Sequence, residues 1–150
     1  MAVQRERPYG NYNYLVDLGT GDTSGPLAGF CEVIFPEAAL RVIEYRSGNY
    51  KENDVLKVTG LESYTNLVLK RGVIGSLDLY DWWNQLHNGD TTAIRNVIVQ
   101  LQNEDHTEVV LSWKFMRARP VKYTFSPLNA QADGVLVEEI ELAFERMEME

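Results

Sequence analysis

Two glycine-rich stretches contain residue types that bind phosphate in other proteins. The first, VDLGTGDTSG, runs from Val16 to Gly25 behind an apparent strand, as a dinucleotide-binding turn does. Such a turn must lead into a helix, whose N-terminus holds the pyrophosphate, but here Pro26 and another extended segment follow. The second, KRGVIGS at residues 70–76, places Lys before Gly, whereas a P-loop needs Gly-Lys-Ser/Thr directly before its helix. We interpret both stretches as strand ends and loops.

Other residues that could do chemistry are few and scattered. Asp78 and Asp81 lie three positions apart on a predicted helix and could pair as general acid and base, although a capping role and a solvated face explain them better. His87 falls at the helix end and His106 in a turn, and no Cys/His cluster has zinc-ligand spacing. We therefore expect no enzyme activity, no metal and no cofactor. A small hydrolase that uses Asp78, Asp81 or His106 stays an alternative.

Length and charge limit the remaining classes. The 150 residues suit a single domain, 1–150, with a packed core, and the lone Cys31 is expected to be a small packed side chain. A net charge of −8 disfavours nucleic-acid binding but would suit the wall of a conduit that repels DNA. The first ten residues, MAVQRERPYG, lack the apolar core of a signal peptide, and no apolar run is long enough to span a membrane. We expect synthesis in the cytoplasm and no membrane binding by the monomer.

Period-two alternation of apolar and polar residues dominates the chain. It predicts strands at about 11–18, 27–35, 40–46, 64–73, 94–102, 109–125 and 135–149, with a hairpin turn at 103–107. One helix is predicted, with Ser76 as its N-cap and Gly89 at its exit. The segment at about 47–63 is rich in polar and turn residues and is predicted to be a long extended loop. The fold class is therefore mainly β: an antiparallel barrel or two packed sheets with one flanking helix.

Two groups of side chains are candidates for contacts with another chain. Lys70 and Arg71 are interpreted as strand-end charges whose partners are carboxylates of a neighbouring subunit. Trp82 and Trp83 are adjacent in the helix and point about 100° apart, so one can face the core while the other lies at its margin. Packing in the core alone, and packing combined with a subunit interface, both stay open for this aromatic pair.

Several short motifs, in the same order, resemble the tail tube family, the inner tube protein of contractile phage tails and of phage-tail-like extracellular injection systems. The similarity extends from about Pro8 to Glu145. One departure is the run from Ile34 to Glu37, IFPE, where the family commonly has Val-Ser-Gly-Leu. The clearest matches are VIEYR.G at 42–48, LKRGV at 69–73, LYDW at 79–82, W.F..A.P.KY at 113–123 and LNA at 128–130.

The resemblance implies a barrel-like subunit, related in design to the type VI secretion tube protein, with no catalytic residues, metal or cofactor. Six copies would close into a ring, and rings would stack into a hollow tube inside a sheath that drives it into a target. Implied partners are further copies of the chain, the sheath protein, the baseplate or tube-initiator protein, the terminal cap protein and a protein cargo in the lumen. The chain would then be made in the bacterial cytoplasm and become part of a tail or injection particle.

The predicted loop fits this picture as an extension that reaches into an adjacent subunit or ring. Tyr50, Val55 and Leu56 would supply its apolar contacts, and we expect the loop to be flexible in solution and to order on assembly. Two alternatives remain: a monomeric β-barrel binding module, and the tail tube of a true contractile phage that carries DNA.

Overall fold

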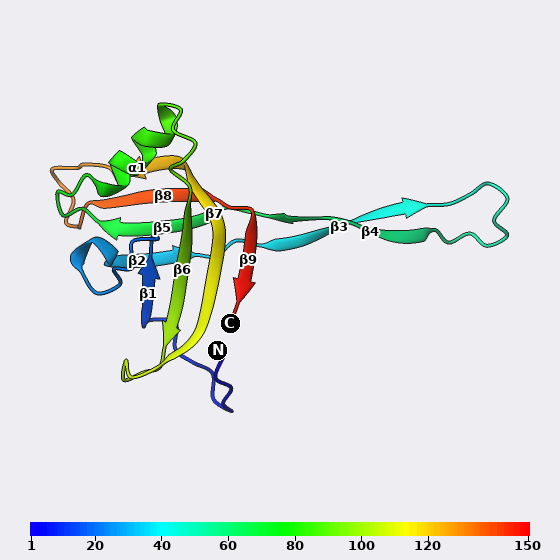
Figure 1. Cartoon of the computed structure of the whole chain (residues 1–150), viewed down its shortest axis with the longest axis horizontal. Coiled ribbons are helices and arrows are strands. Elements are labelled where there is room, and N and C mark those ends of the chain that lie inside the picture. The colour runs from blue at the N-terminus through cyan, green and yellow to red at the C-terminus, as the bar shows by residue number, and fades with distance from the viewer.

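The computed structural model describes the whole chain, Met1–Glu150. Antiparallel strands dominate, and a single α-helix lies beside them (Figure 1), so the predicted fold class is confirmed. The elements in chain order are β1 (Tyr14–Asp17), the 3-10 helix η1 (Pro26–Ala28), β2 (Phe30–Ile34), β3 (Ala38–Tyr45), β4 (Leu56–Tyr64), β5 (Leu67–Gly72), α1 (Asp78–His87), β6 (Arg95–Gln102), β7 (Val109–Phe125), β8 (Val137–Ala143) and β9 (Arg146–Met149).

Seven of the strands form one sheet that folds over into two layers. Its hydrogen-bonded order is β1-β6-β7-β8-β5-β2, with β9 also paired to β7. Strand β7 belongs to both layers, because its first half pairs with β6 and β9 and its second half pairs with β8. In Figure 1 the strands β1, β6 and β9 run across the direction of β2, β5 and β8. The two layers therefore pack crosswise over a shared core.

The corner between the layers is built from local backbone features. Arg117 has a positive φ of 55°, and its N–H donates to Asn96 Oδ1 at 3.0 Å. The N–H of Glu145, in the bend between β8 and β9, donates to the Met116 carbonyl of β7 at 3.0 Å. The sequence predicted one terminal strand over 135–149. That prediction is corrected here, because the chain bends at Phe144 and Glu145 and continues as two strands in different layers.

The core follows the alternation of the sequence. Leu67 and Leu69 of β5 and Ile140 and Leu142 of β8 point inward from one layer, and Trp82 of α1 closes the side of the core. Full burial of each such side chain stabilises the fold by roughly 1.5–3 kcal/mol. The rest of the cluster consists of Val16, Leu18, Phe30, Leu79, Ala93, Val97, Val99, Phe115 and Ala118.

Strand β2 contains a bulge that changes the expected position of the cysteine. Phe30 pairs with Arg71 and Glu32 pairs with Lys70, so one extra residue, Cys31, lies between two consecutive pairs. The bulge leaves Cys31 exposed, with its thiol donating to the Lys70 carbonyl at 3.4 Å. The prediction that Cys31 is a packed side chain is therefore wrong.

Helix α1 begins slightly later than the sequence predicted. Leu77 occupies the N-cap position, and the Oγ of Ser76 accepts weakly from the N–H of Asp78 at 3.4 Å. Gly89, with φ +88°, follows the helix end as predicted, because a residue without a side chain adopts this left-handed conformation readily. No helix combines the length and the apolar character that crossing a membrane requires.

The strands β3 and β4 form a separate two-stranded ribbon that projects from the rest of the molecule (Figure 1). We call residues 38–64 the arm and the remaining residues the body. The pairing runs from Ala38 opposite Tyr64 to Tyr45 opposite Leu56. The predicted loop at about 47–63 is thus partly wrong: residues 56–63 belong to strand β4, and only residues 47–55, at the tip of the arm, are a loop. Strand β4 was not predicted because Gly60 interrupts the alternation that Leu56 and Val58 begin.

Candidate assembly surface

The arm exposes apolar side chains along both strands. Every residue of β3 is exposed, and most of β4 is exposed as well. Leu61, at 85% exposure, is the extreme case. A two-stranded ribbon with no sheet behind it cannot bury these side chains itself, and contiguous exposed apolar surface of this kind marks an interaction site. The large apolar side chains concerned are Leu40, Val42, Ile43, Tyr45, Leu56, Val58 and Leu61.

The tip of the arm contains the residues that the sequence singled out for contact with a neighbour. Tyr50, Val55 and Leu56 are all exposed there. The turn between them is braced by Arg46, whose guanidinium donates to the carbonyls of Tyr50 at 3.0 Å and Glu52 at 3.1 Å. These side chains are available to a second chain, and their role in an interface stays a prediction. The exposed side chains of β3 were missed at the sequence level.

The direction of the arm is fixed at its root. The chain passes from β2 to β3 through residues 35–37 and from β4 to β5 through residues 65–66. There the N–H of Glu37 donates to Thr65 Oγ1 at 2.7 Å, and the N–H of Thr65 donates to the Glu37 carbonyl at 3.1 Å. Close packing continues at Gly60, where an added Cβ would lie 2.8 Å from the Arg41 carbonyl oxygen. The arm therefore extends β2 and β5 beyond the body, as Figure 1 shows.

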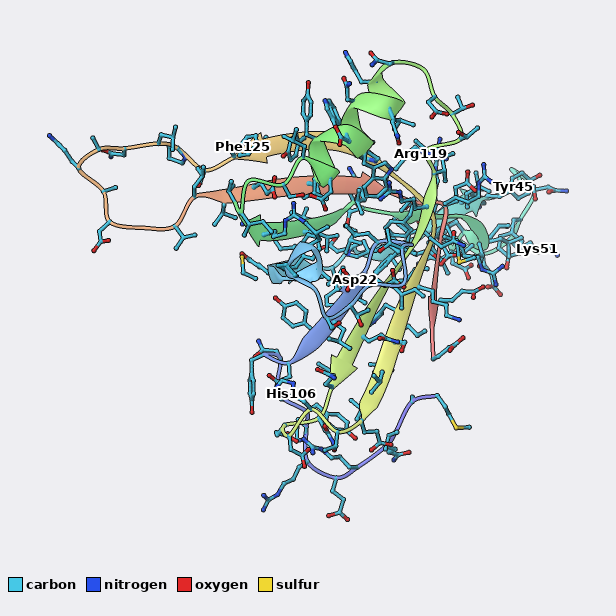
Figure 2. The ribbon with its side chains drawn as sticks, turned by 60° about the vertical axis from the view of Figure 1, so that its left-hand side comes forward. Asp22, Tyr45, Lys51, His106, Arg119 and Phe125 are labelled. Carbon is cyan, nitrogen blue, oxygen red and sulfur yellow. The ribbon has the colours of Figure 1, made fainter.

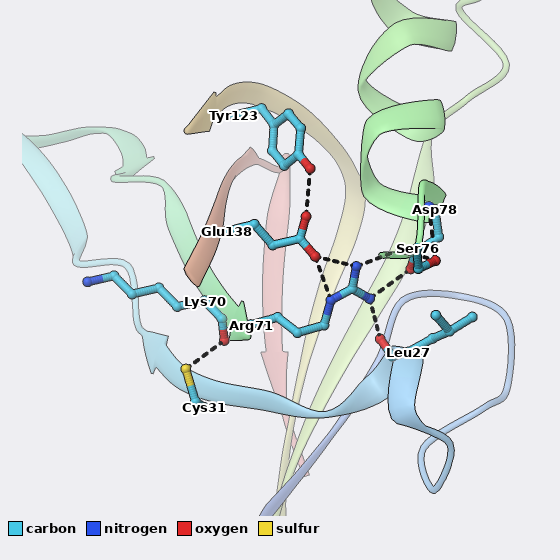
Figure 3. A network of polar contacts seen from close by, with 8 residues as sticks. All are labelled: Leu27, Cys31, Lys70, Arg71, Ser76, Asp78, Tyr123 and Glu138. Carbon is cyan, nitrogen blue, oxygen red and sulfur yellow. Dashed lines mark hydrogen bonds and ion pairs between the residues drawn. The ribbon is translucent and has the colours of Figure 1, made fainter. Parts of the chain in front are cut away.

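Arg71 lies inside the body (Figure 3). Its side chain is only 1% exposed, and all five N–H donors of the guanidinium have acceptors within the chain. Two donors contact Oε1 of Glu138 at 2.8 and 2.5 Å, two contact the carboxylate of Asp78 at 2.9 and 2.6 Å, and one contacts the Leu27 carbonyl at 2.7 Å. Tyr123 completes the network by donating to Glu138 Oε2 at 2.6 Å.

This geometry corrects the hypothesis that Arg71 bridges to a neighbouring subunit. Its charge joins β5, β8, η1 and the start of α1 within one chain. Burial opposes ionisation of Asp78, but the hydrogen bonds and the positive charge of Arg71 outweigh it and lower the pKa of that carboxyl. Burial, together with the hydrogen bond to Glu138, raises the pKa of Tyr123. The network thus stabilises a fixed pattern of charges at the base of the helix.

Lys70 has a different environment from its neighbour. It points away from the core, and its Nζ lies 3.4 Å from Glu32 Oε2 on β2. Glu139 of β8 is its cross-strand partner on the other side. Lys70 remains partly exposed, so its predicted contact with another chain is sterically open and stays a prediction.

The two tryptophans differ in burial, as their adjacent positions on the helix predicted. Trp82 is fully buried, and its indole N–H donates to the Ala93 carbonyl at 2.7 Å. This corrects its place among the interface candidates, because its side chain is part of the core. Trp83 is only partly buried and stacks on His87 with ring centroids 6.1 Å apart. Trp83 is therefore the member of the pair that a partner could reach.

The body also has unpaired sheet edges. Strand β1 pairs only with β6, β2 only with β5, and β9 only with β7. Each leaves one row of backbone N–H and C=O groups without a strand partner, which permits pairing with another chain.

The residues considered for acid–base chemistry do not converge. Asp78 is bound to Arg71, whereas His106 lies in the turn between β6 and β7, at the other end of the body from α1 (Figure 2). A hollow of about 380 Å³ beside α1 contains Asp78, Asp81 and Arg95. No group of three or more His, Cys, Asp or Glu side chains is arranged to hold a metal ion. A second, more apolar hollow of about 550 Å³ lies between β1 and β2 and includes Tyr14 and Trp113.

Comparison with known proteins identifies the family. The family described as T4-like virus tail tube protein gp19 matches residues 10–148. A chain in the PVC extracellular contractile injection system, sheath–tube complex in the extended state, is 28% identical, with a TM-score of 0.81 over 97% of this chain and 93% of that one. A chain of the anti-feeding prophage baseplate, 6-fold symmetrised, is 25% identical, with a TM-score of 0.81 over 97% of each chain.

More distant structures share the fold. Hcp1 from Flavobacterium johnsoniae is 15% identical, with a TM-score of 0.56 over 91% of this chain and 93% of that chain. A search of curated protein sequences gives no significant match. The resemblance noted in the sequence motifs is confirmed by the family match and by these folds. Because the match covers nearly the whole chain, the protein belongs to the tail tube protein family.

Proposed function

We propose that this chain is the structural subunit of the inner tube of a contractile injection system. Six copies close into a ring, and the rings stack into a hollow conduit that a contracting sheath drives into a target. The observation that carries the proposal is the arm, whose apolar side chains no part of the same chain covers. The unpaired edges of β1, β2 and β9 supply a second kind of contact, between neighbours in a ring.

The partners follow from the similar structures. One is described as a sheath–tube complex, one as a 6-fold symmetrised baseplate, and one as a sheath/tube terminator. By analogy, the chain contacts further copies of itself, a sheath protein, a baseplate protein and a terminal cap. The role is mechanical, with no catalytic centre, metal or cofactor, and the chain assembles after synthesis in the bacterial cytoplasm.

We favour an injection particle, because one of the similar chains described above comes from a structure described as an extracellular contractile injection system. A protein in the lumen is the cargo that we propose for such a particle. A contractile phage tail that carries DNA is the alternative within the family. The net charge of −8 is compatible with both, since an acidic wall repels DNA during passage. Neighbouring capsid and terminase genes would favour the phage, and their absence beside sheath and baseplate genes would favour the particle.

Size-exclusion chromatography combined with negative-stain electron microscopy of the purified chain tests the proposal. We expect six-fold rings, or tubes built from them. A strict monomer at high protein concentration, even with its sheath protein present, would contradict the proposal and favour a monomeric binding module. The apolar hollow between β1 and β2 would then be the first place to look for a ligand.

A further inference from the structure

The connection between β7 and β8 contains a short segment that makes no hydrogen bond to the rest of the chain. Residues 126–136 form this connection, which projects from the body beyond Phe125 (Figure 2). Its first part is held by a turn in which the N–H of Ala132 donates to the Asn129 carbonyl at 3.1 Å. Residues 133–135, which follow the turn, are all exposed, and neither their backbone nor their side chains are hydrogen-bonded. Nothing in the fold therefore restrains these residues.

The only Asp-Gly pair of the chain, Asp133–Gly134, lies in this segment. Glycine has no Cβ, so the backbone nitrogen of Gly134 is little hindered, and an added Cβ there would meet no atom within 4 Å. An exposed carboxyl group thus lies next to an exposed amide that has no other partner. The side-chain carboxyl of an aspartate can react with the backbone nitrogen of the next residue, because the product is an unstrained five-membered ring.

We propose that Asp133–Gly134 is a site of spontaneous isoaspartate formation. The Gly134 nitrogen attacks Cγ of Asp133, a C–N bond forms, and the carboxyl hydroxyl and the amide hydrogen leave as water. A water molecule then opens the succinimide ring. Cleavage between the nitrogen and Cγ restores aspartate, whereas cleavage between the nitrogen and the main-chain carbonyl carbon of Asp133 gives isoaspartate. One water leaves and one enters, so the conversion consumes no other reactant.

The fold can accept the product. Isoaspartate lengthens the main chain by one methylene group and leaves the net charge of the chain unchanged. The next ordered contact is at Val137, whose N–H donates to Ser126 Oγ at 2.9 Å where β8 begins. Because residues 133–135 make no bond that the longer chain would break, isoaspartate should accumulate without unfolding the body. The inference concerns the single chain and does not depend on the proposed tube function.

A second pair provides a comparison within the same molecule. Asn88–Gly89 is the only Asn-Gly pair, and it closes the same ring with ammonia as the leaving group. There the N–H of Gly89 donates to the Leu86 carbonyl at 3.1 Å, as part of the end of α1. The nitrogen is held in place, so the helix end must open before the ring can form. Folding should therefore slow the reaction at Asn88 and leave the reaction at Asp133 almost unaffected.

Peptide mapping by mass spectrometry of the full chain, aged at neutral pH either folded or in urea, tests the inference. Isoaspartate is identified by fragmentation and by methyl transfer from labelled S-adenosylmethionine, catalysed by an isoaspartyl methyltransferase. We expect the rate at Asp133 in the folded chain to lie within about twofold of its rate in urea, and the rate at Asn88 to be roughly tenfold lower or less. Equal slowing of both sites on folding, or no isoaspartate at Asp133 in the folded chain, would overturn the inference.

Two variants assign the reaction to these atoms. Asp133→Glu keeps the charge but would need a six-membered ring, so methylation of this peptide should fall to background. Gly134→Ala hinders the nitrogen and should lower the rate at Asp133 by about fivefold or more, while the open space and the absence of a positive φ let the variant fold normally. Asp54→Glu, at an exposed aspartate followed by Val55, is the matched control and should leave the rate at Asp133 unchanged. Undiminished methylation in Asp133→Glu, or an unchanged rate in Gly134→Ala, would contradict the assignment.

Discussion

In the body, even a buried guanidinium has an acceptor for each of its five N–H groups, whereas in the arm leucine, valine and tyrosine side chains face solvent on both strands. The body buries its apolar residues in one core and pairs its internal charges. The arm has only its backbone ladder and the bonds at its root and tip. The body should therefore be stable as a monomer, while the arm gains most of its order from a partner.

The largest expected effect comes from removing the buried cation. Arg71→Met leaves Glu138 buried beside Asp78 without a counter-charge, and we expect the free energy of unfolding of the monomer to fall by about 3–5 kcal/mol. Urea denaturation measures this change. The matched control is Arg119→Met, which removes a half-exposed ion pair with Glu145 at 3.3 Å and should cost less than about 1 kcal/mol. Similar small losses in both variants would contradict the claim that the buried network around Arg71 stabilises the body.

Acid should weaken the body through the same network. The pKa of Asp78 is lowered in the folded chain, so its contribution is present above the unfolded value near 3.8 and is lost as pH falls through the folded value. We expect Asp78→Asn to be less stable than the wild type at pH 7 and to lose less stability on acidification below pH 4. Urea denaturation at several pH values gives both curves; parallel curves would exclude Asp78 as the responsible group.

A change in the arm should impair assembly and leave the stability of the body nearly unchanged. Gly60→Ala places a Cβ 2.8 Å from the Arg41 carbonyl oxygen, so the ribbon must shift locally. We expect the free energy of unfolding of the body to change by no more than about 0.5 kcal/mol, as is typical of surface substitutions. Tube formation should decrease. Denaturation and electron microscopy of the same preparation provide the comparison. A large loss of body stability would show that the two regions are coupled.

A similarly small effect on folding is expected at Lys70. Lys70→Glu removes an exposed pair with Glu32 and places like charges beside Glu139, at a cost of about 0.2–1 kcal/mol. Because Arg71 is untouched, this variant tests whether Lys70 contacts another subunit without disturbing the core. Impaired ring assembly by a folded monomer would support that contact, and normal rings would leave Lys70 as a surface residue with no role in assembly.

Most of the body was predictable because alternation fixes which face of a strand is buried. The same alternation also indicates the buried network around Arg71. Arg71 shares its strand face with Leu67 and Leu69, and Glu138 shares one with Ile140 and Leu142. Opposite charges on the inner faces of two strands predict a buried pair once those strands are neighbours. That adjacency comes from the pairing of strands distant in sequence, which alternation alone does not specify.

The arm was harder to predict for a physical reason. Alternation reports burial within one chain, and a ribbon that buries its side chains only against another molecule has apolar residues on both faces. Val42 and Ile43 are adjacent in β3, and both are exposed. The polar tip and Gly60 then made the second strand of the arm resemble a loop. The bend of the terminal strand at Phe144 and Glu145 also lacks a local signal, because it depends on the corner in β7.

Hydrogen–deuterium exchange of the monomer and of assembled tubes, followed by mass spectrometry, tests the central claim most directly. The account predicts that amides of residues 38–64 exchange rapidly in the monomer and become strongly protected in tubes. Amides of β5 and β8, in the core, should be protected in both states. Equal exchange of the arm in monomers and tubes would contradict the claim that the arm is the part of this chain completed by assembly.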